Sequence, residues 1–212
     1  VIGATITEGA TMVMEGINPV LIESAAAFNG SPVGPLAALD EISLETAYKN
    51  GKQGQEDAKA RGEKQAQNAT FDLVERMVTK LDRKGKIYGG GFYEYPEGGK
   101  KHIWPGLKEL YAKKGWKDVP FEDIKDRLVF SQVIEAVRAM EEGVIESVAD
   151  GNIGSIMGIG FPPFRGGACR YVDQMGVANY VALCEKYAHL GKAYEAPQLL
   201  KDMAAGNKKF FG

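Results

Sequence analysis

Apolar residues recur at spacings of three and four along the first part of the chain, at Ile2, Ile6, Ala10, Val13 and Ile17. This spacing places them on one side of a helix that Gly16 would end. Pro19 suits the first turn of a second helix over 20–28, because the N–H that it lacks has no helical partner there. Two glycines and two prolines in 30–35 predict a non-helical corner, followed by a further helix over 36–50.

The middle of the chain has a different pattern. Residues 51–69 are rich in Gly, Gln, Lys and Glu and contain few apolar residues, so we expect an exposed, mobile segment. Thr70 is placed to cap the next helix, whose apolar stripe is Phe71, Val74, Met77, Val78 and Leu81. A basic, glycine-rich loop follows over 84–95, and a short extended piece at 91–95 is its strand-like part.

Helical spacing returns in the last part of the chain. A long helix is expected from about Phe121 or Asp126 to Gly143, with an apolar stripe of Phe130, Val133, Ile134, Val137 and Met140. Shorter helices are expected at 177–187 and 197–205. Since no segment alternates strongly enough to compete as a strand, the pattern predicts an all-α fold.

The same order of features occurs twice. The first set is Glu8, a Glu15-Gly16 turn, the glycine-proline corner at 30–35 and Asp40. The second set is Glu135, Glu142-Gly143, a corner at 160–167 and Asp173. We therefore predict two tandem homologous helical modules, at 1–98 and 121–212, joined by a connector at 99–120. Two copies suit a pseudo-dimer, in which each copy covers an apolar face of the other.

Composition narrows the functional classes. The chain has 212 residues, 44% of them hydrophobic and 25% charged, with a net charge of −2. Mixed charge of this kind argues against a nucleic-acid or membrane-surface role, and no apolar run is long enough to predict a membrane span. Without a visible signal peptide, a cytoplasmic protein is expected. Val1 already reads as the body of a helix, which suggests a piece of a longer protein.

The chemistry-bearing residues are few. The chain has two cysteines, Cys169 and Cys184, and two histidines, His102 and His189. Their spacing is not that of a zinc site, so no metal site is expected. Both thiols read as reduced packing residues, and both histidines as surface residues. Arg83, Lys84 and Lys86 lie beside three glycines; a solvated turn is the plainer interpretation and phosphate binding the alternative.

The repeated acids read as structural. Asp40 and Asp173 are expected to brace the corner that precedes them. Glu8 and Glu135 either form a polar pair where the copies meet or are solvated glutamates on their helices. Arg165 is interpreted as a hydrogen-bond hub for carbonyls at helix ends, with phosphate binding as its alternative. Trp104 and Trp116 are interpreted as packing anchors of the connector.

Three phrases carry a family resemblance: Gly-Ser-Pro-Val-Gly-Pro-Leu-Ala-Ala-Leu-Asp at 30–40, Lys-Ile-Tyr-Gly-Gly-Gly-Phe-Tyr at 86–93, and Gly-Ile-Gly-Phe-Pro-Pro-Phe-Arg-Gly-Gly at 158–167. Together they resemble the C-terminal domain of 3-hydroxyacyl-CoA dehydrogenases. The tandem arrangement is similar to that of the multifunctional fatty-acid β-oxidation α-subunit, which fuses an enoyl-CoA hydratase to the dehydrogenase.

The resemblance implies an oxidoreductase that moves a hydride from a 3-hydroxyacyl-CoA to NAD. Its catalytic His and Glu, and its dinucleotide turn, belong to a Rossmann domain that precedes this region in the family. We therefore expect neither catalytic nor cofactor-binding residues in this chain. The Gly154–Gly160 pattern follows no strand and cannot replace that turn. Met157 stands where some members have a substrate-contacting Tyr, and is the one substrate-binding residue predicted.

The resemblance thus implies a region that forms one wall of the acyl-CoA cleft, contacts the Rossmann domain, supplies a dimer-like interface in cis, and is inactive alone. Loss of the Rossmann domain would expose an apolar patch, so self-association is also expected. Two alternatives stay open at this point. One is a stand-alone helical interaction module, and the other is the all-α domain of a different β-hydroxyacid dehydrogenase.

Overall fold

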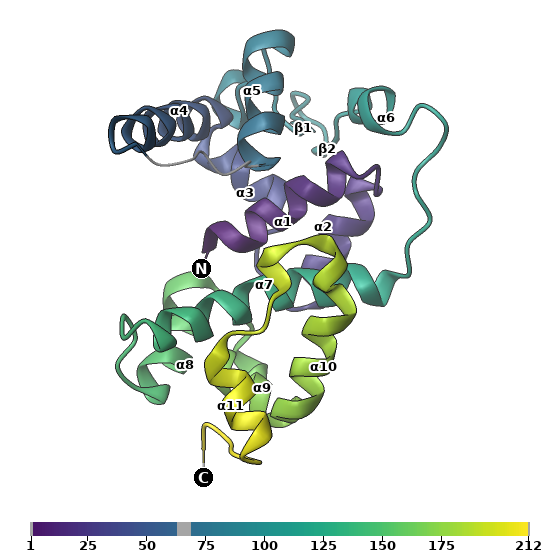
Figure 1. Ribbon diagram of the computed structural model, residues 1–212. Coiled ribbons are helices and arrows are strands. Elements are labelled where there is room, and N and C mark those ends of the chain that lie inside the picture. Colours follow the sequence, from purple (N-terminus) through teal and green to yellow (C-terminus); the bar gives the residue numbers. More distant parts are fainter. Residues whose placement is uncertain (1, 63–68, 212) are drawn as a thin grey trace. The chain divides into compact units, whose positions relative to one another are not determined.

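The computed structural model describes residues 2–62 and 69–211, and the fold is all-α, as predicted (Figure 1). The helices up to residue 111 are α1 (Ile2–Met14), α2 (Pro19–Phe28), α3 (Pro35–Ile42), α4 (Leu44–Ala60), α5 (Ala69–Leu81) and α6 (Gly106–Tyr111). Those after it are α7 (Phe121–Glu141), α8 (Val148–Ile159), α9 (Ala168–Met175), α10 (Val177–Tyr187) and α11 (Gln198–Ala205). Short 3-10 turns lie at 86–88, 163–165, 188–190 and 192–194.

The described residues divide into two compact units. The first unit comprises 6–27 and 33–124, and the second comprises 2–5, 28–32 and 125–211. The units follow the two sequence sets only approximately, because residues 30–32 of the corner and the start of α1 group with the second unit. The predicted modules at 1–98 and 121–212, and their pseudo-dimer arrangement, stay predictions.

The core of the first unit is apolar and built from α1 to α5. Its fully buried side chains include Met12, Ile17, Ile22, Leu36, Leu44, Leu73 and Met77. Helices α4 and α5 lie side by side (Figure 1). They approach closely at Gly51, where an added Cβ would lie 2.5 Å from the Phe71 ring, while Tyr48 stacks on that ring with centroids 5.7 Å apart. A glycine inside α4 therefore has a packing role.

The expected helix over 36–50 is two helices. It breaks at Ser43, whose backbone has φ 81 and ψ 123, values that a residue with a Cβ rarely adopts. The buried Ser43 hydroxyl donates to the Lys84 carbonyl over 3.1 Å, so a contact distant in sequence holds the break. In the second unit, Gly176 separates α9 from α10 with φ 88 and ψ 127, nearly the same conformation.

Residues 51–62 are largely exposed, as predicted, and the mobility expected for this segment stays a prediction. Two features of the middle segment differ from expectation. Helix α4 continues to Ala60, because Gln, Lys, Glu and Ala form helices well even when they are exposed. Of the segment expected to be mobile, residues 63–68 lie outside the described residues. Thr70 does not cap α5, since the helix begins at Ala69; its hydroxyl donates to the Thr7 hydroxyl over 3.1 Å.

The connector is part of the first unit. Strand β2 (His102–Ile103) pairs antiparallel with β1 (Tyr93–Glu94), within the piece expected to be extended. The Trp104 amide donates to the Phe92 carbonyl over 2.8 Å, and the Lys117 amide donates to the Gly16 carbonyl over 2.8 Å. These bonds hold both ends of the 99–120 segment against the unit.

The second unit is built around α7. Its buried cluster joins α7 to α9, α10 and α11 through residues such as Phe130, Val133, Val137, Val172 and Leu200. The Phe130 and Tyr180 rings stack with centroids 4.3 Å apart and nearly parallel planes. The expected bounds of α7, α10 and α11 are confirmed to within two residues.

Candidate functional site

The three cations beside the glycine-rich loop all have partners. Arg83 donates through Nε to the Gly91 carbonyl over 2.6 Å and lies over the Trp104 ring at 4.3 Å. Lys84 pairs with Asp82 at 2.8 Å, and Lys86 pairs with Glu41 at 2.7 Å. All three cations therefore make contacts within the protein, which favours the structural interpretation over phosphate binding.

Asp40, on α3, holds the end of this loop. Its Oδ1 accepts from the Phe92 amide over 2.8 Å and its Oδ2 from the Tyr93 amide over 2.9 Å, while the Tyr95 hydroxyl donates to Oδ2 over 3.0 Å. The side chain is fully buried. The predicted structural role is thus correct, but the partner is a segment more than fifty residues further along the chain and not the adjacent corner.

Glu23, on α2, is a second acid in the same unit. It accepts from the first amides of α3, at Leu36 over 2.8 Å and Ala37 over 3.3 Å, and from the Tyr93 hydroxyl over 2.6 Å. A carboxylate at a helix N-terminus satisfies amides that have no partner inside the helix. The sequence analysis missed this role of Glu23, because a single glutamate in a helix gives no sign that it contacts the start of another helix.

Burial raises the pKa of both acids. Loss of water is the largest cause at Glu23 and at Asp40, and the hydrogen bonds to each carboxylate oppose it only in part. Burial likewise raises the pKa of Tyr93 and of Tyr95. These four groups satisfy one another and the backbone, so the arrangement binds the loop tightly and supplies no group poised to attack a substrate.

The raised pKa of Glu23 has a measurable consequence. The folded chain holds this proton more tightly than the unfolded chain, so the stabilisation is complete below the ordinary value of 4.5 and is lost as pH rises through the raised value. Glu23→Gln has no such proton. We expect the unfolding free energy of the wild type, relative to this variant, to fall from about pH 4 toward neutrality. Urea titrations across that range check it, and a relative stability that rose with pH would contradict it.

The second unit repeats the arrangement of Asp40. Asp173, on α9, accepts from the Phe210 and Phe211 amides, each over 2.9 Å. In both units one carboxylate thus holds two consecutive amides of an aromatic pair. Asp173 is only half-buried and Phe211 is 43% exposed, so this version is more open to water.

Asn152 takes the place of Glu23 in the second unit. Its Oδ1 accepts from the Arg170 amide in α9 over 3.1 Å, and the buried Ser155 hydroxyl accepts from the Ala168 amide over 3.1 Å. A glycine lies against the polar side chain in each unit. An added Cβ would lie 2.5 Å from the Glu23 carboxyl at Gly34 and 2.5 Å from Asn152 at Gly167.

Met157 lies on α8 and is 82% exposed. Ile153, one turn earlier on the same side of the helix, is 61% exposed. The predicted substrate-contacting residue is therefore on an accessible apolar surface of the second unit.

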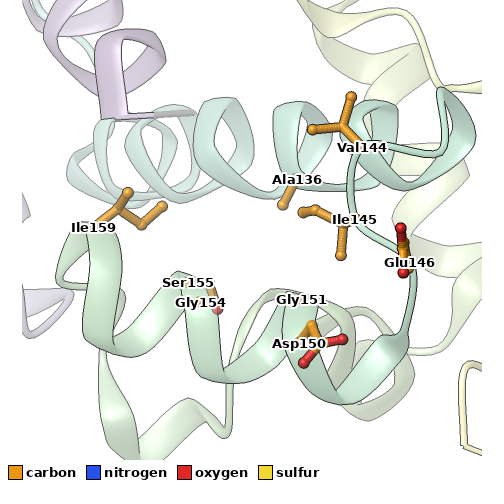
Figure 2. Close-up of a pocket in the computed structure, with 9 residues that line it drawn as sticks. All are labelled: Ala136, Val144, Ile145, Glu146, Asp150, Gly151, Gly154, Ser155 and Ile159. Carbon is orange, nitrogen blue, oxygen red and sulfur yellow. The ribbon is translucent and has the colours of Figure 1, made fainter.

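A groove adjoins this surface. It lies between α7 and α8, has a volume of about 440 Å³, and is lined by small and apolar residues with two acids at one end (Figure 2). Figure 2 shows Glu146 and Asp150 at that end and Ile159 at the other. Sequence reasoning missed the groove, because its two walls come from separate helices.

Arg165 does not gather carbonyls at helix ends. Its guanidinium lies 5.0 Å from the Tyr171 ring centre and within 3.4 Å of the Asn29 side-chain oxygen. Arg138 performs the expected role instead, because it donates to the carbonyls of Lys192 and Glu195, each over 3.0 Å.

The remaining candidates have structural roles. Glu135 forms an ion pair with Arg138 on its own helix, and Glu8 is buried, while the predicted pairing of Glu8 with Glu135 stays a prediction. Burial raises the pKa of Cys169 and of Cys184 to about 11, so neither thiol ionises readily at neutral pH. Both histidines are exposed, as predicted.

The described residues contain neither a cluster suited to a metal ion nor a helix suited to a membrane. Among these residues, His, Cys, Asp and Glu form no group of three or more that could hold a metal ion. Of the helices over 2–62 and 69–211, none is long and apolar enough to cross a membrane.

Comparison with known proteins identifies the class. Residues 1–95 match the family described as 3-hydroxyacyl-CoA dehydrogenase, C-terminal domain. Residues 1–95 thus carry a domain of this family, as the sequence resemblance predicted.

Particular relatives extend the likeness beyond residue 95. The chain is 40% identical to the fatty acid oxidation complex subunit alpha of Acinetobacter baumannii (strain AYE), in an alignment of 208 residues that covers 95% of the chain. It is 41% identical over 190 residues to the protein of the same name from Acinetobacter baylyi, and 39% identical over 189 residues to that from Psychrobacter arcticus. The alignments cover 86% of the chain in the last two cases. The chain spans 28%, 26% and 26% of the length of these relatives.

Proposed function

We propose that this chain is the substrate-side helical region of an NAD-dependent 3-hydroxyacyl-CoA dehydrogenase of fatty-acid oxidation. In this role it forms one wall of the acyl-CoA cleft and contacts the Rossmann domain. The observation that carries the proposal is the similarity over 95% of the chain to fatty acid oxidation complex alpha subunits. The interactions of Asp40 and Glu23 support it, because both acids are occupied in holding the fold.

The chemistry divides between the two regions. The Rossmann domain of the parent would hold NAD, which would supply a hydride acceptor for C3 of the 3-hydroxyacyl group, and a base of that domain would take the hydroxyl proton. The present chain binds and orients the acyl-CoA and keeps water from it. Met157 and Ile153 offer exposed apolar contacts that suit the methylene groups of such a substrate.

We also propose that the chain contains two copies of one module, which supply a dimer-like interface in cis. Three matched pairs support this: Asp40 with Asp173, Gly34 with Gly167, and Ser43 with Gly176. The members of each pair stand 133 residues apart. A constant spacing of this kind is typical of a duplicated segment.

The dehydrogenase activity of a fusion protein tests the first proposal. The chain alone should not oxidise NADH with acetoacetyl-CoA, whereas the chain fused behind the Rossmann domain of the Acinetobacter baylyi relative should. In the fusion protein, Met157→Asp should raise the KM for a medium-chain 3-ketoacyl-CoA about tenfold and leave kcat within about twofold, because uniform substrate binding is lost. Met157→Leu is the matched control and should change neither constant by more than about twofold. Turnover by the chain alone would refute the proposal.

A further inference from the structure

The groove between α7 and α8 has the size of a docking site. From Asp150 to Ile159 its floor follows α8 for nine residues, which corresponds to about 14 Å, or two and a half helical turns. Ala136 of α7 and Ile145 of the following turn form the opposite wall (Figure 2). The groove is therefore long enough for two to three turns of another helix.

Two glycines leave one side of α8 without projecting side chains. Gly154 and Gly158 are exposed, and an added Cβ at either position would meet no described atom within 4 Å. Glycine weakens a helix relative to alanine, and no packing within the described residues offsets that cost here. A spacing of four residues places both glycines on one ridge of the helix, where a second helix can approach closely.

Exposed apolar side chains border the groove. Val144 is 73% exposed and belongs to the lining, and Ile145 and Ile159 are further apolar residues of the lining. Contiguous apolar surface of this kind is typical of contact with another protein.

Charge indicates which kind of partner fits. Residues 139–164 contain four carboxylates, at Glu141, Glu142, Glu146 and Asp150, and no Lys, Arg or His. Glu146 and Asp150 line one end of the groove. This end would repel the phosphates of CoA, and an acyl chain offers it no positive charge. A basic side chain next to an apolar stripe complements both the end and the floor.

We propose that this groove docks an amphipathic helix, which lays small and apolar side chains along Gly154 and Gly158 and places a Lys or Arg beside Glu146 and Asp150. This helix-in-groove contact goes beyond the proposed function, because its ligand is a protein segment and not the substrate. Unlike a substrate contact, it is expected to weaken with salt.

Peptide binding tests the proposal with the 212-residue chain. The probe is a labelled synthetic helix of about 18 residues with a Leu/Ala stripe and lysines at both ends of the stripe. One control peptide replaces each Lys with Glu, and a second scrambles the stripe. We expect the Lys peptide to bind at least about tenfold more tightly than either control at low salt, and to protect amides of 144–159 from hydrogen exchange.

Matched variants locate the contact. Gly154→Leu should weaken binding of the Lys peptide about tenfold or more, because the side chain would fill the approach to α8. Gly54→Leu on α4 is the control, since its Cβ is equally open, and it should leave binding unchanged. Circular dichroism and thermal melting establish that both variants are folded.

Four results would overturn the proposal. Equal affinity for the Lys and Glu peptides would contradict the role of charge. Unchanged affinity of Gly154→Leu for the Lys peptide would show that the peptide does not bind in this groove. Protection of 144–159 by octanoyl-CoA but not by the peptide would assign the groove to substrate. A dimer that Gly154→Leu dissociates in sedimentation would assign it to a second copy of the chain.

Discussion

Replacing Asp40 with alanine is expected to lower the free energy of unfolding by about 3–5 kcal/mol. The substitution leaves the Phe92 and Tyr93 amides and the Tyr95 hydroxyl without their acceptor. Each buried polar group without a partner costs about 1–3 kcal/mol, and the fully buried position of Asp40 limits replacement by water. Urea titration of the wild type and the variant measures the loss.

Asp173→Ala is the matched control, because it removes the same two amide contacts in the second unit. Here the side chain is half-buried and Phe211 is exposed, so water replaces much of the lost bonding. The expected cost is about 1 kcal/mol. Similar losses at the two aspartates would show that burial does not set the value of this contact, and would contradict the argument.

Asp40→Asn separates geometry from charge. The amide retains one acceptor oxygen, so it can serve either the Phe92 or the Tyr93 amide but not both. We therefore expect the free energy of unfolding of this variant to lie between those of the wild type and Asp40→Ala. Arg83, which binds the Gly91 and Tyr93 carbonyls from the other side, would hold part of the loop in place.

Local sequence patterns predicted most of the helices because the information for them is local. Apolar spacing and the terminating glycine place α1, and Pro19 places the start of α2. Ser43 shows where this reasoning stops. A serine carries no signal for a helix break, and its positive φ depends on a hydrogen bond to Lys84 that only the folded chain brings within reach.

The candidate site shows the same limit. Met157 was reached through family resemblance, and its exposure agrees with a contact role. The acidic run of 139–164 is readable in the sequence, yet its meaning depends on the pairing of α7 with α8, which places Glu146 and Asp150 at one end of a groove. Periodicity gives the face of a helix but not the neighbour that it meets.

Glycine positions also needed the fold. The sequence predicts non-helical corners from Gly and Pro, but it does not reveal that Gly34 and Gly167 each lie against a polar side chain of the preceding helix. In both cases this side chain accepts from an amide in the first turn of the helix that follows: Glu23 from Ala37, and Asn152 from Arg170. Close approach at the glycine is therefore a condition for satisfying those amides.

This contact leads to the second large effect, at Gly167. A Cβ there would lie 2.5 Å from the Cα of Asn152, and the backbone has φ 101 and ψ 170, a region open almost only to glycine. Gly167→Ala should therefore cost about 3 kcal/mol, since α8 and α9 must separate and the Asn152 bond to Arg170 is lost. Hydrogen exchange should become faster at the Arg170 amide.

Gly166→Ala is the neighbouring control. Its φ of 75 is left-handed but less restrictive, and its added Cβ would meet only the flexible Arg170 side chain, at 2.9 Å. The expected cost is about 1 kcal/mol, the ordinary penalty of alanine in this conformation. If Gly167→Ala cost no more than Gly166→Ala in the same urea titration, contact with Asn152 would not be what requires a glycine at 167, and the match with Gly34 would lose its physical basis.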